Sequence, residues 1–198
     1  MEKKLVLASN NKKKMKELNE LLSPLGVEVI TQGSLGVESC EEPFFTFLEN
    51  ALTKARHASR ETGLPAIADD SGICVDVLGG APGVFSARYA GEPTSDANNN
   101  AKLLADLADK EDRSAHYTCV VVAVRSADDP EPLVAVGRWD GKIGFEAKGE
   151  GGFGYDPYFV TADGRHGAEL TADEKNAVSH RGHAMRDMMK LLSERWQW

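Results

Sequence analysis

The chain has 198 residues, of which 41% are hydrophobic and 27% charged, and a formal net charge of −8 at pH 7. This length is enough for one good-sized core, and the acidic balance argues against general binding to nucleic acid or to anionic membranes. Three widely spaced cysteines without a CxxC pair, and no apolar run long enough for a signal peptide or a membrane span, favour a cytoplasmic protein with reduced thiols.

The first third of the chain alternates short apolar strands with amphipathic helices. Residues 5–8 and 27–30 are strand candidates, and the apolar positions of residues 15–22 follow helical spacing. A T-x-x-E capping box at Thr46 opens a second helix, which is expected to end at Gly63.

The rest of the chain continues this alternation. Strands are predicted at residues 65–68, 73–78, 117–124, 133–139 and 158–160, and helices at 95–108 and after the capping box at Thr171. The strands at 117–124 and 133–139 are expected to pair around the Asp-Asp-Pro turn between them. We therefore predict an α/β fold in one domain, residues 1–198, with a mixed sheet flanked by helices.

The first polar cluster follows the first strand. The sequence Ser-Asn-Asn at residues 9–11 precedes Lys12, Lys13, Lys14 and, one residue further on, Lys16. A strand that runs through small polar residues into a helix offers backbone N–H groups and a positive helix end to a phosphate. The alternative is an asparagine helix cap with solvated lysines, since neither a Walker A loop nor a G-x-G-x-x-G motif is present.

The second cluster is acidic. Glu41-Glu42 lies in one segment, and Asp69-Asp70-Ser71-Gly72 follows an apolar strand. Carboxylates at the rim of an α/β sheet, together with phosphate, are a common way for proteins to hold Mg²⁺. An acidic turn is the structural alternative, and the D-x-D motif of haloacid dehalogenase-type phosphatases is absent.

The third and fourth clusters lie near the C-terminus. Residues 149–157 place four glycines around Phe153 and Tyr155, which indicates a tight backbone that displays rings for stacking on a base, or rings that belong to the core. Lys175 and the Ser-His-Arg sequence at 179–181 can read a purine edge or bind phosphate, or else form a helix start capped by Ser179.

Six motifs in this order resemble the inosine/xanthosine triphosphate pyrophosphatase family over nearly the whole chain. They are LASNNKKK, EEPFFTFLENALTKAR, AIADDSG, VLGGAPGVFSARYAG, GGFGYDP and AELTADEKNAVSHRG. The resemblance implies Mg²⁺-dependent hydrolysis of ITP, dITP and XTP to the monophosphate and pyrophosphate, which cleanses the nucleotide pool. It also implies a homodimer and two lobes around an active-site cleft over a long mixed sheet.

The resemblance also assigns roles to residues. Asp70 would be the catalytic residue that acts on the attacking water, and Mg²⁺ would bind Asp70 with Glu42 or its neighbour Glu41. His180 and Arg181 would read the 6-oxo group of the base. The full set implied to bind substrate is Ser9, Asn10, Asn11, Lys14, Lys54, Ser71, Phe153, Gly154, Tyr155, Asp156, Lys175, His180 and Arg181.

Two alternatives of function remain open. A Maf-type nucleotide pyrophosphatase would share the reaction but prefer other nucleotides. A catalytically silent nucleotide-binding protein would share the pocket without the reaction. The first motif also departs from the Thr-Gly-Asn of many relatives, which leaves Lys13 open as an alternative to Lys14.

Overall fold

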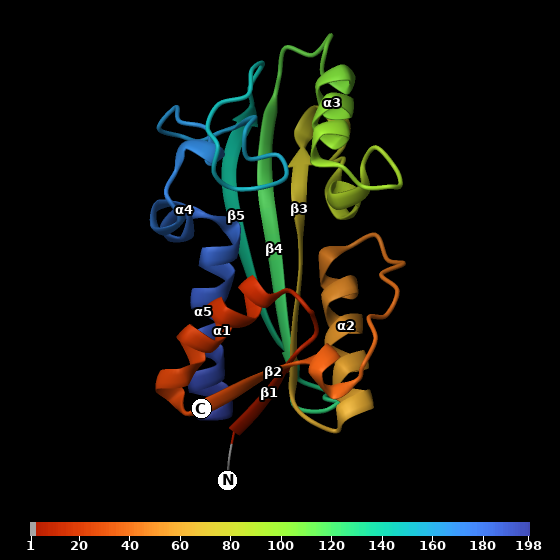
Figure 1. Cartoon of the computed structure of the whole chain (residues 1–198), viewed down its shortest axis with the longest axis vertical. Coiled ribbons are helices and arrows are strands. Elements are labelled where there is room, and N and C mark those ends of the chain that lie inside the picture. The colour runs from red at the N-terminus through yellow and green to blue at the C-terminus, as the bar shows by residue number, and fades with distance from the viewer. Residues whose placement is uncertain (1–2) are drawn as a thin grey trace. The chain divides into compact units, whose positions relative to one another are not determined.

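The computed structural model describes residues 3–198 (Figure 1). Its strands are β1 Lys3–Leu7, β2 Val27–Thr31, β3 Ala66–Val75, β4 Ser114–Val124, β5 Leu133–Ile143 and β6 Phe159–Val160. Its α-helices are α1 Lys12–Leu22, α2 Phe47–Thr62, α3 Asp96–Asp106, α4 Ala172–Val178 and α5 His180–Trp196. No helix in the described part of the chain has the length and apolar character needed to cross a membrane.

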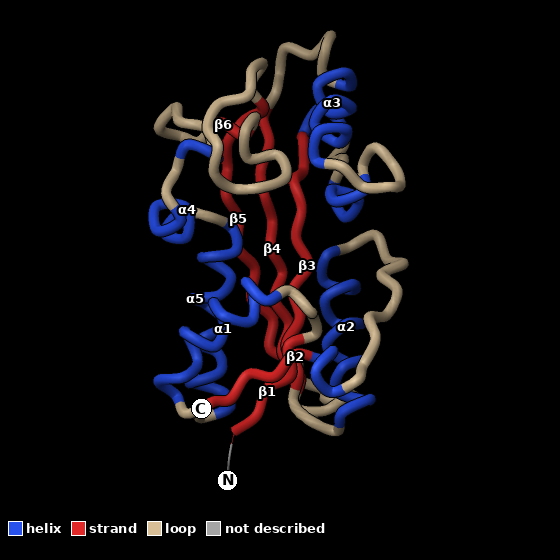
Figure 2. Tube along the Cα trace, viewed as in Figure 1, coloured by secondary structure: helices blue, strands red, loops and turns tan. Residues whose placement is uncertain are grey.

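The strands form one six-stranded sheet in the order β2-β1-β3-β4-β5-β6. Strand β1 pairs in parallel with β2 on one side and with β3 on the other, whereas β5 and β6 pair antiparallel. Helices flank the sheet along the chain (Figure 2). The predicted fold class, an α/β protein with a mixed sheet flanked by helices, is therefore confirmed.

Both predicted capping boxes mark helix starts. The Thr46 hydroxyl accepts from the backbone N–H of Glu49 at 3.1 Å, and α2 ends at Gly63, whose φ of 70° suits a left-handed cap. Thr171 and Glu174 cap α4 reciprocally, because each side chain accepts from the other residue's backbone N–H. Local chemistry thus fixes where these two helices begin.

One prediction about boundaries was wrong. Strands expected at 65–68 and 73–78 are one continuous strand, β3, so the Asp-Asp-Ser-Gly segment at 69–72 lies inside a strand rather than in a turn. Sheet pairing outweighs the turn preference of Asp, Ser and Gly here, since β3 lies between β1 and β4. A second helix, α5, begins directly after Ser179, whose hydroxyl accepts from the backbone N–H of Gly182 at 3.1 Å, so the alternative of a helix start capped by Ser179 is confirmed.

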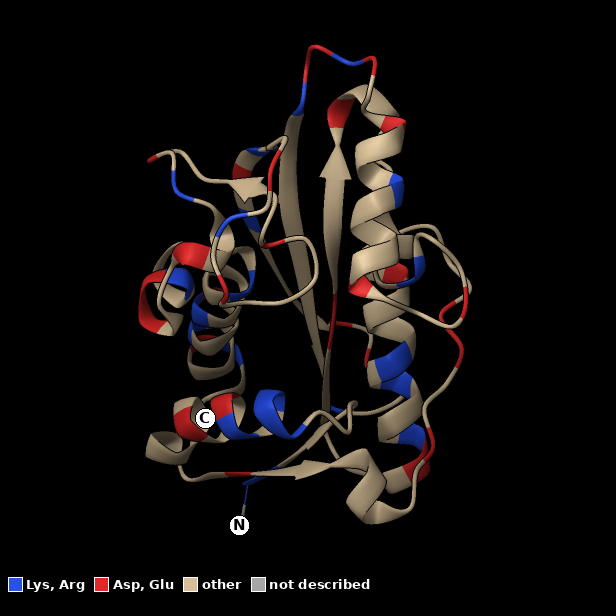
Figure 3. Ribbon diagram, turned by 45° about the horizontal axis from the view of Figure 1, so that its top comes forward, with Lys and Arg blue, Asp and Glu red and all other residues tan. Residues whose placement is uncertain are grey.

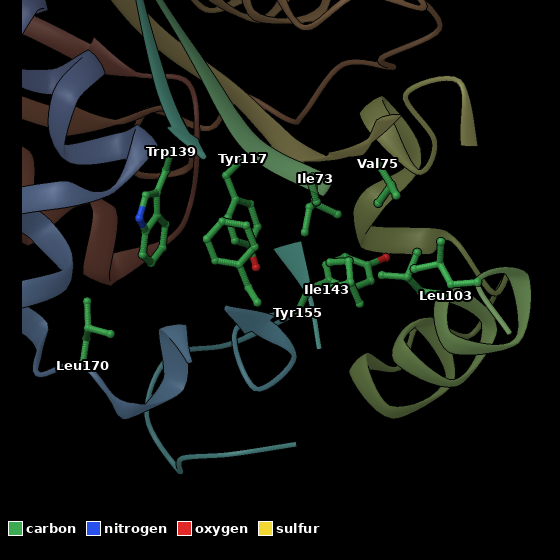
Figure 4. Packing of buried hydrophobic residues seen from close by; sticks show 11 residues of the cluster. Ile73, Val75, Leu103, Tyr117, Trp139, Ile143, Tyr155 and Leu170 are labelled. Atoms are coloured by element: carbon green, nitrogen blue, oxygen red, sulfur yellow. The ribbon is translucent and has the colours of Figure 1, made fainter. Parts of the chain in front are cut away.

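The chain divides into two compact units, each with its own core. Unit 1 comprises residues up to Asp70, Val120–Val136 and Ala184–Trp198, and in it the alanines of α2 pack on β1, β3 and β4. Unit 2 comprises Ser71–Cys119 and Gly137–His183. Its core contains Tyr117, Trp139, Tyr155 and Phe159 among aliphatic side chains (Figure 4). The single domain over 1–198 and the cleft between lobes stay predictions.

Candidate functional site

In unit 1, three small polar residues shape the turn between β1 and α1. The Asn11 side chain accepts from two backbone N–H groups of the first helical turn, at 3.0 and 3.2 Å, and so caps α1. Ser9 accepts from the N–H of Asn11 at 3.1 Å, and Asn10 accepts from the N–H of Gly33 at 2.9 Å. A Cβ on Gly33 would lie 2.2 Å from that Asn10 oxygen, so a larger residue there would displace the Asn10 side chain. The helix-cap alternative for Asn11 is confirmed.

Basic residues, blue in Figure 3, gather at the start of α1, and the lysines among them differ in their exposure. Lys14 is half-buried, and its Nζ lies 2.8 and 3.0 Å from the two carboxylate oxygens of Asp69, which is 8% exposed. Lys12, Lys13 and Lys16 are exposed, as predicted. Lys14 is therefore the lysine of this group that is held in place by a carboxylate on β3.

A second lysine–carboxylate pair joins α2 to the loop before it. The Nζ of Lys54 lies 2.6 Å from Oε1 of Glu42. Burial lowers the pKa of Lys54, but the hydrogen bond and attraction from Glu42, with attraction from Asp70 and Asp69, raise that pKa overall. Glu41 is exposed, whereas Glu42 is half-buried. The geometry therefore favours Glu42 over Glu41 as the carboxylate of this group.

A polar pocket of about 210 Å³ lies beside this pair. Its lining comprises Ala8, Ser9, Asn10, Gln32, Ser39, Cys40, Glu42 and Lys54. The Gln32 side chain, which is 3% exposed, donates to the Ser39 hydroxyl at 3.1 Å. Burial raises the pKa of the Cys40 thiol, which therefore stays protonated at neutral pH. The lining thus presents neutral polar groups together with one cation, Lys54, and its paired carboxylate, Glu42.

The carboxylates of unit 1 also fit a magnesium ion that is completed by substrate. Among the described residues, no group of three or more His, Cys, Asp and Glu side chains is arranged as a metal cage. Mg²⁺, however, is usually held by one or two carboxylates plus substrate phosphates rather than by an all-protein cage. Glu42, Asp69 and Asp70 are hard oxygen donors, and all three lie close enough to Lys54 to act on its charge.

Unit 2 contains a separate pocket of about 190 Å³. Seven of the predicted site residues line it: Ser71, Phe153, Gly154, Tyr155, Asp156, Lys175 and His180. Arg181 is half-buried on the first turn of α5 and is not among the residues that line this pocket. Tyr117, Asp96, Asn99 and Ser86 also line it, although the sequence did not single them out.

Asp156 is the central polar group of the unit 2 pocket. It is 2% exposed and accepts from the Tyr117 hydroxyl at 3.0 Å, from the backbone N–H of Phe153 at 2.9 Å and from the Lys175 ammonium. Lys175 also lies over the Phe153 ring, 4.4 Å from its centroid. A buried carboxylate with three donors is well satisfied, so Asp156 holds the other residues in place.

Aromatic rings form one wall of this pocket. The His180 ring stacks on Tyr117 with centroids 4.6 Å apart and planes within 10°. Tyr117 in turn stacks on Trp139 at 5.8 Å and meets Phe159 at 4.7 Å. Burial and the nearby Asp156 hold the pKa of Tyr117 well above its ordinary value, so its hydroxyl remains a donor. Figure 4 shows Tyr117 and Trp139 side by side.

The two rings of the glycine-rich segment have different surroundings. Phe153 is 67% exposed, whereas Tyr155 is buried and donates its hydroxyl to the Ser86 carbonyl at 2.6 Å. The two alternatives for this segment therefore each apply to one residue: Phe153 displays its ring to solvent, and Tyr155 belongs to the core. Gly152 has φ 68°, and a Cβ there would lie 2.2 Å from Asp156 Oδ2.

The missed residues carry little signal in the sequence. Asp69 was seen as part of the acidic motif, but nothing in the pattern indicates that it binds Lys14. Tyr117 sits among apolar residues of a predicted strand, where an aromatic residue reads as core. Its hydroxyl has significance only once Asp156, 39 positions away, lies beside it.

The fold and these two sets of residues define an α/β protein of the nucleotide-binding class, with cations suited to phosphate and rings suited to a base. The chain belongs to the Ham1 family, whose model matches residues 5–191. It is 62% identical to a dITP/XTP pyrophosphatase of Chromobacterium violaceum, over 95% of this chain and 96% of that one. It is 58% identical to a dITP/XTP pyrophosphatase of Ralstonia nicotianae, over 96% of each chain. The solved structure of a HAM1 protein from Coxiella burnetii matches with a TM-score of 0.94 at 47% identity, covering 97% of this chain and 99% of that one.

Proposed function

We propose that this protein is a nucleoside triphosphate pyrophosphatase that hydrolyses the non-standard purine nucleotides dITP, XTP and ITP to the monophosphate and pyrophosphate. The relatives described above are named dITP/XTP pyrophosphatase and align with this chain over almost their full length. Such an enzyme is a hydrolase acting on acid anhydrides. Removing these nucleotides keeps them out of DNA and RNA, and a homodimer in the cytoplasm is part of the same proposal.

The two lysine–carboxylate pairs of unit 1 are the observation that carries the proposal. Lys14 is paired with Asp69, and Lys54 with Glu42. A triphosphate that arrives with a divalent cation brings both signs of charge. The lysines can bind phosphate oxygens, while Glu42, Asp69 and the adjacent Asp70 present carboxylates near the cation, so the charges that the lysines leave are compensated. A general anion site would have no need of the carboxylates.

Glu42 and Asp70 would hold Mg²⁺, with Glu41 as the exposed alternative. Bound there, the ion would neutralise negative charge on the phosphate oxygens. Asp70 would orient the attacking water, and Lys14 and Lys54 would bind phosphate oxygens. Ser9, Asn10 and Asn11 would contact the substrate from a preformed turn, because their side chains already hold that turn.

The pocket of unit 2 would receive the purine. Phe153 presents an exposed ring for stacking, with the Lys175 ammonium over that ring and Ser71 and Gly154 in the lining. His180 and Arg181 would donate to the 6-oxo group of hypoxanthine or xanthine. Adenine carries an amino donor at that position, so those donors would stay unpaired and ATP would bind poorly.

A panel of nucleoside triphosphates tests the proposal directly. Pyrophosphate release is measured with and without Mg²⁺ for ITP, dITP, XTP, ATP, GTP and the pyrimidine triphosphates. The proposal expects release that needs the metal and strongly favours the first three. Preference for another nucleotide would favour the Maf-type alternative, and binding without release would favour the silent binder.

A further inference from the structure

Tyr117 makes two contacts in unit 2 that serve different parts of one pocket. Its hydroxyl donates to Asp156 Oδ1 at 3.0 Å, and its ring lies flat against His180 at 4.6 Å. The side chain is 7% exposed, and it packs against Trp139 and Phe159. One rigid residue on β4 therefore touches both a carboxylate and an imidazole that line the pocket.

We propose that Tyr117 is the positioning residue of the base pocket: its hydroxyl fixes Asp156, and its ring fixes the plane of His180. This inference rests on the proposed function, in which the pocket receives a purine. Tyr117 acts through its neighbours and does not itself touch the reacting phosphates.

The hydroxyl of Tyr117 completes the hydrogen bonds that hold the Asp156 carboxylate. Asp156 has two carboxylate oxygens, and Tyr117 bonds Oδ1 while Lys175 and the Phe153 N–H share Oδ2. A carboxylate fixed at both oxygens cannot rotate, so the ammonium of Lys175 stays over the Phe153 ring. Without the hydroxyl, Oδ1 of a buried carboxylate loses a donor and the carboxylate can turn, taking Lys175 with it.

The aromatic ring of Tyr117 restricts the orientation of the His180 ring. The planes of Tyr117 and His180 differ by only 10°, and the Trp139 ring also lies nearly parallel to His180, at 13° and 6.3 Å between centroids. A stacked imidazole can slide but not tilt, so its ring nitrogens stay in one plane. Discrimination between a 6-oxo and a 6-amino group depends on such a fixed donor plane, because a donor that can tilt away tolerates either partner.

Two substitutions separate the contribution of the Tyr117 hydroxyl from that of its ring. In Tyr117→Phe the ring remains and the hydroxyl is lost, so we expect KM for ITP to rise about three- to tenfold while kcat changes less than about twofold. The preference for ITP over ATP should persist in that variant. In Tyr117→Leu both the hydroxyl and the aromatic ring are lost, and the preference for ITP over ATP should fall by about tenfold or more.

Tyr89→Phe is the matched control. Tyr89 also donates its hydroxyl to a carboxylate, that of Asp106, within unit 2, but neither residue lines the pocket. Its KM, kcat and nucleotide preference should equal those of the wild type. Binding of inosine monophosphate without metal, followed by calorimetry, gives a readout that needs no turnover, and Tyr117→Phe should weaken it by the same factor as KM.

The outcomes are distinct. If Tyr117→Phe lowers the melting temperature but leaves KM and inosine monophosphate affinity unchanged, Tyr117 is only a core residue and the inference is wrong. If Tyr117→Leu keeps the full preference for ITP over ATP, the inference that the Tyr117 ring fixes the plane of His180 is wrong. If the wild type binds inosine monophosphate but releases no pyrophosphate, the proposed function fails while the binding data still judge Tyr117. If it does neither, both proposals fail.

Discussion

The two units carry candidate sites of opposite character. In unit 1 the polar residues pair as cation and carboxylate, Lys14 with Asp69 and Lys54 with Glu42, around a small polar pocket. In unit 2 the pocket is built on stacked rings and one buried carboxylate, Asp156. In the proposed function, the first set would exchange partners when a charged ligand arrives, whereas the second set is held by contacts already present in the structure.

Under the proposed function, the charged residues of unit 1 would serve phosphate chemistry and the pocket of unit 2 would serve base recognition. Phosphate and metal chemistry needs charges that can redistribute, whereas discrimination between bases needs donors that do not move. Substitutions in unit 1 should therefore act mainly on kcat. Those in unit 2 should act mainly on KM and on nucleotide preference.

Asp70→Asn should have the largest effect. The change removes the charge but keeps the shape, so kcat with ITP and Mg²⁺ should fall by about a hundredfold or more. The melting temperature should stay within about 2 °C of the wild-type value, since the side chain is half-buried rather than part of the core. Asp128→Asn, at an exposed carboxylate of the same unit, is the control and should change neither quantity. Full activity in Asp70→Asn would remove Asp70 from the catalytic role.

Lys14→Ala and Lys16→Ala compare two lysines of one helix. Lys14 holds Asp69 and is proposed to bind phosphate, so its loss should lower kcat/KM about ten- to a hundredfold. Lys16 is exposed and lies 3.9 Å from Glu20, so its loss should change kcat/KM by less than about twofold. Steady-state rates with ITP measure both. Equal and small effects would mean that the Lys14–Asp69 pair is structural and that Lys14 binds no phosphate.

The sequence predicted the fold class and the short motifs of both sites, but not the contacts between distant segments, for a physical reason. Lys14 and Asp70 stand in short local motifs, and capping at Thr46 or Gly63 is decided by neighbours along the chain. The role of Tyr117 depends on Asp156, which only the fold brings beside it. The length of β3 could not be predicted for the same reason: its pairing with β1 and β4, which are distant in sequence, outweighs the local turn preference of residues 69–72.

Gly152→Ala should disturb the unit 2 pocket through its backbone. The residue has φ 68°, and a Cβ there would lie 2.2 Å from Asp156 Oδ2, so the substitution combines backbone strain with displacement of the central carboxylate. We expect the melting temperature to fall by about 5 °C and KM for ITP to rise. Gly164→Ala is the control, because Gly164 also has positive φ, 87°, but a Cβ there meets open space. Similar effects on KM in both variants would contradict the role of Asp156.

His116→Gln should have the smallest effect, and on stability rather than activity. Burial lowers the pKa of His116, as does Arg138, while Asp76 and Asp140 oppose the shift, so the folded protein favours the neutral ring. The unfolded chain takes up a proton near pH 6.5, and the wild type should therefore lose stability as the pH falls below that value. Melting temperatures of the wild type and the variant should differ by the same amount at pH 8 and pH 7, but at pH 5.5 the variant should gain about 1–2 °C relative to the wild type. A constant difference across this range would mean that His116 stays equally protonated in the folded and unfolded chain.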